Sequence, residues 1–335
     1  MIKSVSNRPI TELLNSDGDT IYEVPRYQRE YTWSRDEWEN LFNDIQENDE
    51  GYFLGSMICI NRGSILSTPQ PLELVDGQQR AATLSLLLAA IYSILNEHKE
   101  SLSFEEQLEL LNLKRKLVLK KDADQTRVVL QVQNNNLRDY KAVLSEAGVL
   151  KSYDVPPYAG NRKIFKAYRY FQDRVNHLSD QPEDNIKSIM DLREKINNST
   201  MVLIEVESHS DAYTLFESLN NRGVPLTAVD LIKNKLLSRL EVLDPKHIDV
   251  HFESWNLLIK YLGDDYTIQE RFFRQYYNSF KNKIKNEIET FSGIPVATRS
   301  NLMRIYETLI ERDTKDFLDK ILEAGRCYSL ILNNI

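Results

Sequence analysis

The residues of this sequence best suited to bind an anion form the segment DGQQR, Asp76 to Arg80. This segment lies between the short apolar run Leu72–Val75 and a longer apolar run, so we expect it at a turn between a buried strand and a helix. The first turn of a helix carries free N–H groups and partial positive charge, which attract phosphate. Gly77 permits close backbone approach, and Arg80 adds a planar cation suited to phosphate. The segment predicts a site for a nucleotide phosphate; the alternative is a helix cap with Arg80 paired to Asp76.

A second segment, Pro25–Trp33, interleaves cations with aromatic rings. Its arginines are Arg26 and Arg29, and its aromatic residues are Tyr27, Tyr31 and Trp33. Arginines hold phosphates, while aromatic side chains stack on bases or support the cations. The pattern fits a nucleotide contact about as well as it fits a surface turn whose aromatic residues anchor it to the core.

A third polar segment, Phe216–Asn234, spans the end of one predicted helix and the start of the next. The polar exit of the first helix consists of Asn220, Asn221, Arg222 and Gly223. In the second helix, Asp230, Lys233 and Asn234 are spaced i, i+3, i+4 and share one side. This cluster is one way to complete a ligand pocket. The sequence alone favours a plainer arrangement, a surface pair of Asp230 with Lys233 beside a helix–turn–helix corner.

Hydrophobic periodicity predicts the elements that position these segments. Strands are expected at Ile21–Val24, Tyr52–Ile60, Leu72–Val75 and Met201–Glu207, with one exposed strand at Val128–Val132. Helices are expected at Trp33–Ile45, from Gly77 or Gln78 to Leu95, and at Asn161–Leu178. Capping-box patterns mark helix starts at Ser34–Glu37, Ser208–Asp211 and Thr227–Asp230.

The predicted fold class is α+β. A small mixed-sheet domain is expected from residues 1–96 and 201–240, interrupted by a mostly helical insertion at 97–200. An all-helical domain is expected at 241–335. The apolar run Ala81–Leu95 is too short to span a bilayer, which needs about 20 residues, and it is interpreted as a buried core helix.

Composition narrows the class of protein further. The formal net charge of −8 argues against a surface that binds nucleic acid throughout. A local basic strip for DNA, made by Arg26–Arg29 and Lys114–Lys121, stays open. The two cysteines, Cys59 and Cys327, predict no disulfide framework, and the N-terminus has no apolar signal core. A reducing, cytoplasmic compartment is therefore expected.

The three polar segments, in this order, resemble the N-terminal domain family of the GmrSD-type modification-dependent (type IV) restriction endonucleases. The family pattern I/V-P-x-Y/F-Q-R-x-Y-x-W matches Val24–Trp33. The family's FLG followed by DGQQR matches Phe53–Gly55 and Asp76–Arg80. Its pattern F-x-x-L/I-N-x-R/G-G-x-x-L-x-x-x-D-L-I/L-K matches Phe216–Lys233. One departure is Ala81, where the family usually has leucine.

The family is related to the ParB and sulfiredoxin fold, in which a turn and a helix N-terminus bind a nucleotide. The resemblance therefore implies that the sheet domain is ParB/sulfiredoxin-like. It implies a nucleotide motif of Asp76, Gly77, Gln78, Gln79 and Arg80, with Gln28 and Arg29 across the pocket. The supporting residues of the pocket are then Tyr31, Trp33, Asn220, Arg222, Gly223, Asp230 and Lys233.

The resemblance implies that the chain binds a nucleoside triphosphate, with hydrolysis, to control attack on foreign DNA in antiphage defence. In this hypothesis Asp76 is the catalytic residue and holds Mg²⁺ or orients water. The competing hypothesis is a non-catalytic DNA-binding or partner-docking module that the nucleotide switches. Either function is compatible with a homo-oligomer.

The resemblance does not extend to a nuclease. Full-length members of the family often carry a C-terminal HNH-type site, and nothing after residue 240 resembles one. His247 and His251 stand four apart without the glutamate of a zinc-binding helix. They are expected to be solvent-exposed rather than metal ligands.

Overall fold

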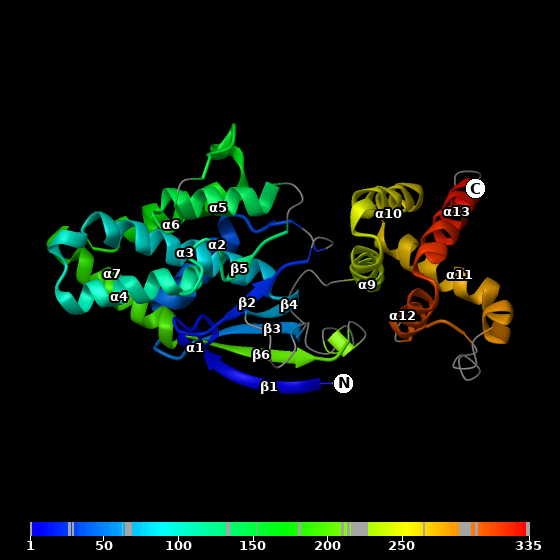
Figure 1. The fold of residues 1–335 in the computed structure, drawn as a ribbon, viewed down its shortest axis with the longest axis horizontal. Coiled ribbons are helices and arrows are strands. Elements are labelled where there is room, and N and C mark those ends of the chain that lie inside the picture. Colours follow the sequence, from blue (N-terminus) through cyan, green and yellow to red (C-terminus); the bar gives the residue numbers. More distant parts are fainter. Residues whose placement is uncertain are drawn as a thin grey trace. The chain divides into compact units, whose positions relative to one another are not determined.

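A computed structural model describes residues 2–25, 28, 30–61, 63, 69–131, 135–151, 153–179, 182–208, 211, 212, 215, 227–263, 265–287, 296–298 and 301–332 (Figure 1). The chain divides into two compact units, residues 1–207 and residues 208–335. Each unit buries its own set of apolar side chains.

The first unit is built on a mixed sheet. Its strands are β1 (Ile2–Pro9), β2 (Thr20–Glu23), β3 (Phe53–Asn61), β4 (Gln70–Asp76), β5 (Val128–Val129) and β6 (Thr200–Val206). In the described residues their order is β1-β6-β3-β4-β2-β5. The pairs β1–β6 and β3–β4 are antiparallel, and the pairs β3–β6, β2–β4 and β2–β5 are parallel. The expected α+β class with a mixed sheet is confirmed.

Helices pack on this sheet and on one another. They are α1 (Ile10–Leu13), α2 (Arg35–Glu47), α3 (Gln78–Glu97), α4 (Phe104–Leu117), α5 (Asn136–Glu146), α6 (Lys163–Asn176) and α7 (Pro182–Asn198), with short 3-10 turns at Lys99–Ser101 and Ala159–Asn161. The central helix is α3, which contacts α4, α5, α6 and α7. Because α3 is apolar on all sides, it requires cover on all sides. Residues between 97 and 200 supply that cover.

Buried tyrosines face the few polar side chains of α3. The Tyr31 hydroxyl lies 2.7 Å from Thr83 Oγ1. Burial raises the pKa of Tyr168 to about 12, although a hydrogen bond with Ser93 acts to lower it. Buried hydroxyls need such partners, since an unpaired one costs free energy. The prediction of a buried core helix is confirmed, and no helix of the described residues is long and apolar enough to cross a membrane.

Two predicted capping boxes define helix starts. At α2, the Ser34 N–H donates to Glu37 at 2.7 Å, and the reciprocal bond is also present. At α9 (Ala228–Leu243), Thr227 and Asp230 form the same reciprocal pair. The apolar residues of α2, Trp38, Leu41, Phe42 and Ile45, are buried. These helix starts follow from local interactions.

The predicted exposed strand at 128–132 is wrong in length and in exposure. Strand β5 has two residues, and Val128 is 1% exposed. The preceding residue, Arg127, is also 1% exposed and donates to three backbone carbonyls. The acceptors are Arg115 O at 2.6 Å, Gly18 O at 2.9 Å and Thr20 O at 3.3 Å. The Arg127 guanidinium joins β5 to the loop before β2, and this explains why the strand is buried and not exposed.

In the second unit, the described residues form helices joined by short connections. After α9 come a 3-10 turn (Pro245–His247), α10 (Ile248–Leu262), α11 (Tyr266–Glu287), α12 (Leu302–Arg312) and α13 (Thr314–Leu332). Aromatic side chains form its centre: the rings of Trp255 and Phe273 stack at 6.0 Å, and the Tyr306 hydroxyl donates to Phe273 O at 2.7 Å. We expected residues 201–240 to return to the sheet. Strand β6 does so, whereas α9 packs on α10, α11, α12 and α13.

Candidate anion site at the start of α3

The turn between β4 and α3 has the predicted form. Strand β4 ends at Asp76, Gly77 is the N-cap, and the helix begins at Gln78. Gly77 has φ +90°, and a Cβ added to it would lie 2.7 Å from Met57 Cγ. Only glycine tolerates both conditions, since it has no Cβ. The N-cap residue Gly77 has no side chain with which to cap α3, and the first N–H groups of a helix have no partner within the helix itself.

Arg80 lies in the first turn of α3 with its guanidinium half-buried. Its Nη1 donates to Ser56 O at 3.2 Å. Burial lowers the pKa of Arg80, and the charge of Asp76 opposes this shift. A guanidinium stays charged at any ordinary pH. A partly desolvated cation at a helix N-terminus attracts an anion more strongly than one in water.

Gln28, which the resemblance implies as a nucleotide-binding residue, contacts this turn. Its Nε2 donates to Val75 O at 3.2 Å, and its Oε1 accepts from Gln78 Nε2 at 3.3 Å. Both glutamines are buried. The end of β4 and the start of α3 are therefore joined to the segment that follows β2. Arg29 lies outside the described residues, as do Arg26 and Tyr27.

Gln79 also joins the start of α3 to the segment that follows β2. Its Oε1 accepts from the Thr32 N–H at 2.8 Å and from the Trp33 N–H at 3.3 Å. Its Nε2 donates to Glu30 O at 2.9 Å. Both ends of this amide are bonded to the backbone. Gln79, which we predicted to contact nucleotide, holds residues 30–33 in place beside the helix start.

The aromatic residues of the second segment anchor it to the core. Tyr31 is 4% exposed, and its hydroxyl accepts from Trp38 Nε1 at 2.8 Å. Trp33 is half-buried and packs against the same core. The alternative interpretation of this segment, an anchored turn, holds for these two residues. Packing against the core therefore fixes where Tyr31 and Trp33 lie relative to the start of α3.

We predict that Gln79→Ala lowers the free energy of unfolding by about 1–3 kcal/mol, because the partly buried N–H groups of Thr32 and Trp33 lose their acceptor. Amide hydrogen exchange at Thr32 and Trp33 should accelerate in the same variant. Urea unfolding and exchange measured by NMR or mass spectrometry test this. Gln275→Ala is the control, since Gln275 is exposed on α11. Unchanged exchange at both amides would contradict the bracing role.

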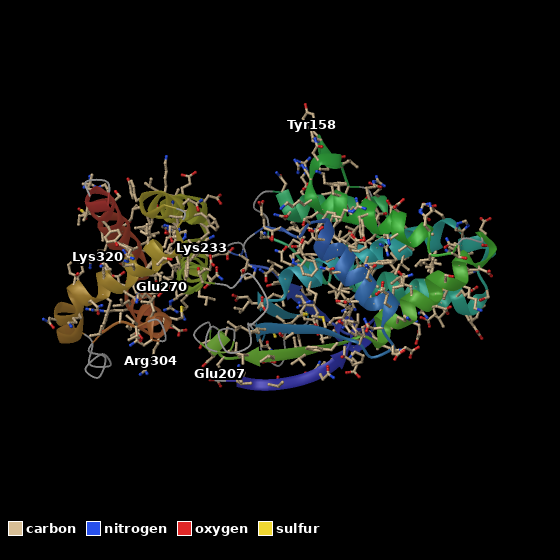
Figure 2. All side chains as sticks on the ribbon, turned by 180° about the vertical axis from the view of Figure 1, so that it is seen from behind. Tyr158, Glu207, Lys233, Glu270, Arg304 and Lys320 are labelled. Atoms are coloured by element: carbon tan, nitrogen blue, oxygen red, sulfur yellow. The ribbon has the colours of Figure 1, made fainter. Side chains whose placement is uncertain are left out.

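The third polar segment is described only in part. Asn220, Arg222 and Gly223 lie outside the described residues. Asp230 accepts from the Thr227 N–H at 2.9 Å in its capping box. Lys233 Nζ lies 5.1 Å from the centre of the Phe252 ring, and its position on α9 is shown in Figure 2. Burial lowers the pKa of Lys233. Within the second unit, Asp230 therefore caps α9 and Lys233 packs on an aromatic ring.

Lysines of the predicted basic strip make contacts within the protein. Lys116 is buried, donates to Thr11 Oγ1 at 3.1 Å, and has its pKa lowered to about 8 by burial. Two exposed pairs follow it along the chain, Lys120–Asp17 at 2.9 Å and Lys121–Asp19 at 2.8 Å. These contacts bury Lys116 and neutralise Lys120 and Lys121, which belong to the basic strip that the sequence left open for DNA.

The paired histidines surround a carboxylate. His247 Nδ1 lies 2.8 Å from Asp244 Oδ1, and Lys315 Nζ lies 2.8 Å from Oδ2. These partners, Lys315 first, hold the pKa of Asp244 well below its usual range. The expectation of exposure is right for His247 and wrong for His251, whose side chain is 17% exposed because it also faces Asp244. No cluster of three or more metal-ligand side chains occurs in the described residues.

Two residues of the anion site were missed by reasoning from sequence. Ser56 supplies the carbonyl that accepts from Arg80, and Gly55 lies directly beneath the guanidinium. The available signal was the FLG triplet, Phe53–Gly55, which contributed to the resemblance but carried no role. A glycine inside an apolar strand indicates a bulge or a close approach, and it could have been read in that way. The cysteines, in contrast, are free as expected, with Cys59 buried and Cys327 exposed.

The fold and the site together define a class of protein. It is an α+β protein in which a polar turn leads from a sheet strand into a buried helix, with a cation in the first helical turn. The family model for the GmrSD restriction endonuclease N-terminal domain matches residues 10–237. This is more than half of the chain, and the chain belongs to that family. It is therefore a module of a restriction endonuclease system.

The matched range includes all three polar segments and ends within α9. The family region thus continues from the first compact unit into the second. No curated protein matches the chain.

Proposed function

We propose that this chain binds a nucleoside triphosphate at the start of α3 and hydrolyses it to control the action of a restriction system on foreign DNA. The observation that carries the proposal is the half-buried residue Arg80 in the first turn of a 20-residue helix whose N-cap is a glycine. Free N–H groups, the helix dipole and a permanent cation all favour a phosphate there. Membership of a restriction endonuclease family supports the role in defence.

Arg80 has the donors that this function needs. A guanidinium offers five N–H donors, and within the described residues Arg80 Nη1 donates to Ser56 O. The planar guanidinium suits a pair of phosphate oxygens, which arginine contacts in bidentate fashion. The Gln28–Gln78 pair forms the neighbouring wall. Its amides suit the polar edges of a base or a ribose.

Asp76 is the residue that we propose for magnesium. Magnesium bound with a nucleotide is commonly held by one or two carboxylates, phosphate oxygens and water. A single carboxylate at the end of β4, beside a phosphate site, fits that mode. When bound, the ion would neutralise charge on the phosphates. Asp76 would also orient the attacking water.

Isothermal titration of the chain with ATP, GTP, CTP and UTP, each with magnesium, tests binding. We expect at least one of them to bind. Ligand at 100 times its Kd should then raise the free energy of unfolding by about 2.7 kcal/mol through mass action. A chain that binds none of the four nucleotides would sink the proposal.

Phosphate release separates hydrolysis from a simple switch. We expect release from the bound nucleotide, and we expect DNA to change its rate. Nucleotide binding without release, unaffected by DNA, would instead favour the non-catalytic module. The two functions use the same pocket, so this assay distinguishes them where affinity does not.

A further inference from the structure

Strand β3 approaches the start of α3 unusually closely. Its pairing with β6 shifts register between Phe53 and Ser56, which marks a bulge. Gly55 lies in this bulge with φ +115°, a conformation that side chains other than glycine's rarely adopt. The bulge brings the Ser56 carbonyl to the helix start, where it accepts from Arg80.

The space beside Gly55 is filled by the guanidinium of Arg80. A Cβ added to Gly55 would lie 2.8 Å from Cζ and 2.9 Å from Nη1 of Arg80. A Cβ added to Gly77 would lie 3.2 Å from Ser56 O. Both glycines therefore lack a side chain close to the bond between Arg80 and Ser56 O. The planar guanidinium lies directly against the strand backbone.

We propose that Gly55 is a positioning residue of the nucleotide site, an inference that rests on the proposed function. Its missing side chain creates the seat in which the Arg80 guanidinium lies, bonded to Ser56 O. The seat fixes the plane of the cation relative to the first turn of α3. Bidentate contact with phosphate depends on that plane. Gly55 acts on the ligand through Arg80 and does not touch it.

A bulge glycine that serves only the sheet would behave differently. Because the guanidinium is the far end of a long side chain, it can move away from an added methyl group, whereas the positive φ of Gly55 makes the substitution lower stability in either case. The substitution therefore changes the position of the Arg80 guanidinium. A purely structural Gly55 would lower stability and leave the affinity of the folded protein unchanged.

Gly55→Ala tests this inference, with Gly51→Ala as the matched control. Gly51 also has positive φ, at +85°, but nothing lies within 4 Å of an added Cβ. The readout is isothermal titration with ATP, GTP, CTP and UTP, each with magnesium. We expect Gly55→Ala to weaken binding by about tenfold or more, as for a lost charged hydrogen bond. Gly51→Ala should bind within about twofold of the wild type, the usual limit for a remote site.

A double-mutant cycle shows whether Gly55 acts through Arg80. We expect Gly55→Ala combined with Arg80→Ala to bind as weakly as Arg80→Ala alone, within about twofold. Additive losses would overturn the inference, as would wild-type affinity in Gly55→Ala. If Gly55→Ala does not fold, a crystal structure of the wild type with nucleotide decides. If the Arg80 guanidinium did not lie against Gly55 in that structure, the inference would be wrong.

The failure of this inference is distinct from the failure of the proposed function. A wild type that binds none of the four nucleotides removes both. A wild type that binds, with Gly55→Ala binding equally well, removes only the role of Gly55. A crystal structure of Gly55→Ala adds a readout besides affinity, because the bond from Arg80 to Ser56 O should be absent.

Discussion

Arg80→Ala is expected to weaken nucleoside triphosphate binding by about 10- to 100-fold, since charged hydrogen bonds contribute about 1.5–3 kcal/mol. The variant removes the only cation of the first helical turn of α3. It leaves Gly77 and the backbone donors in place, so some phosphate affinity should survive. Isothermal titration with the nucleotide that the wild type binds measures the loss.

Two further variants make this result specific. Arg80→Lys keeps the charge but loses the planar fork, and its affinity should fall between those of the wild type and Arg80→Ala. Arg8→Ala removes an exposed cation from β1, so it matches the change in net charge. Wild-type affinity in Arg80→Ala would show that phosphate is bound elsewhere.

Arg127→Ala is expected to lower the free energy of unfolding of the first unit by roughly 3–5 kcal/mol. The side chain is 1% exposed and donates to three backbone carbonyls, of Arg115, Gly18 and Thr20. Truncation leaves those acceptors without their donor and opens a cavity. Urea unfolding followed by circular dichroism measures the change. Since the chain has two units, each transition is fitted separately.

Lys120→Ala is the control for this prediction. Lys120 pairs with Asp17 in the loop that Arg127 also holds, but both partners of that pair are more than half exposed. Exposed pairs contribute little, so the change should stay within about 0.5 kcal/mol. Equal effects of the two substitutions would mean that the buried bonds of Arg127 add nothing to stability.

Some residues of the DGQQR segment contact the rest of the protein, and others are proposed to contact the ligand. Gly77 makes the turn, and Gln79 is bonded at both ends to the backbone of residues 30–33. Gln78 contacts Gln28. Arg80 is the proposed phosphate ligand, and Asp76 is the proposed magnesium ligand. A motif that appears in the sequence as one binding site is therefore also a brace between two polar segments.

The sequence by itself determined the local elements of this protein. The starts of α2 and α9 follow from the pairs Ser34–Glu37 and Thr227–Asp230, because a capping box joins residues three apart. The strand, glycine turn and apolar helix around Gly77 follow from periodicity and from the backbone freedom of glycine. The α+β class follows from the same patterns.

The tertiary structure alone decided which residues meet. Gln79 contacts Thr32 across 47 positions, Arg80 contacts Ser56 across 24, and Arg127 contacts Gly18 across 109. No periodicity encodes such pairs, since they depend on how the packed layers bring distant segments together. For this reason the sequence predicted the strand, turn and helix around Gly77, where the anion site is proposed, but not the contacts of its side chains. The seat of its cation on Gly55, and the bracing role of Gln79, emerged only from the packed fold.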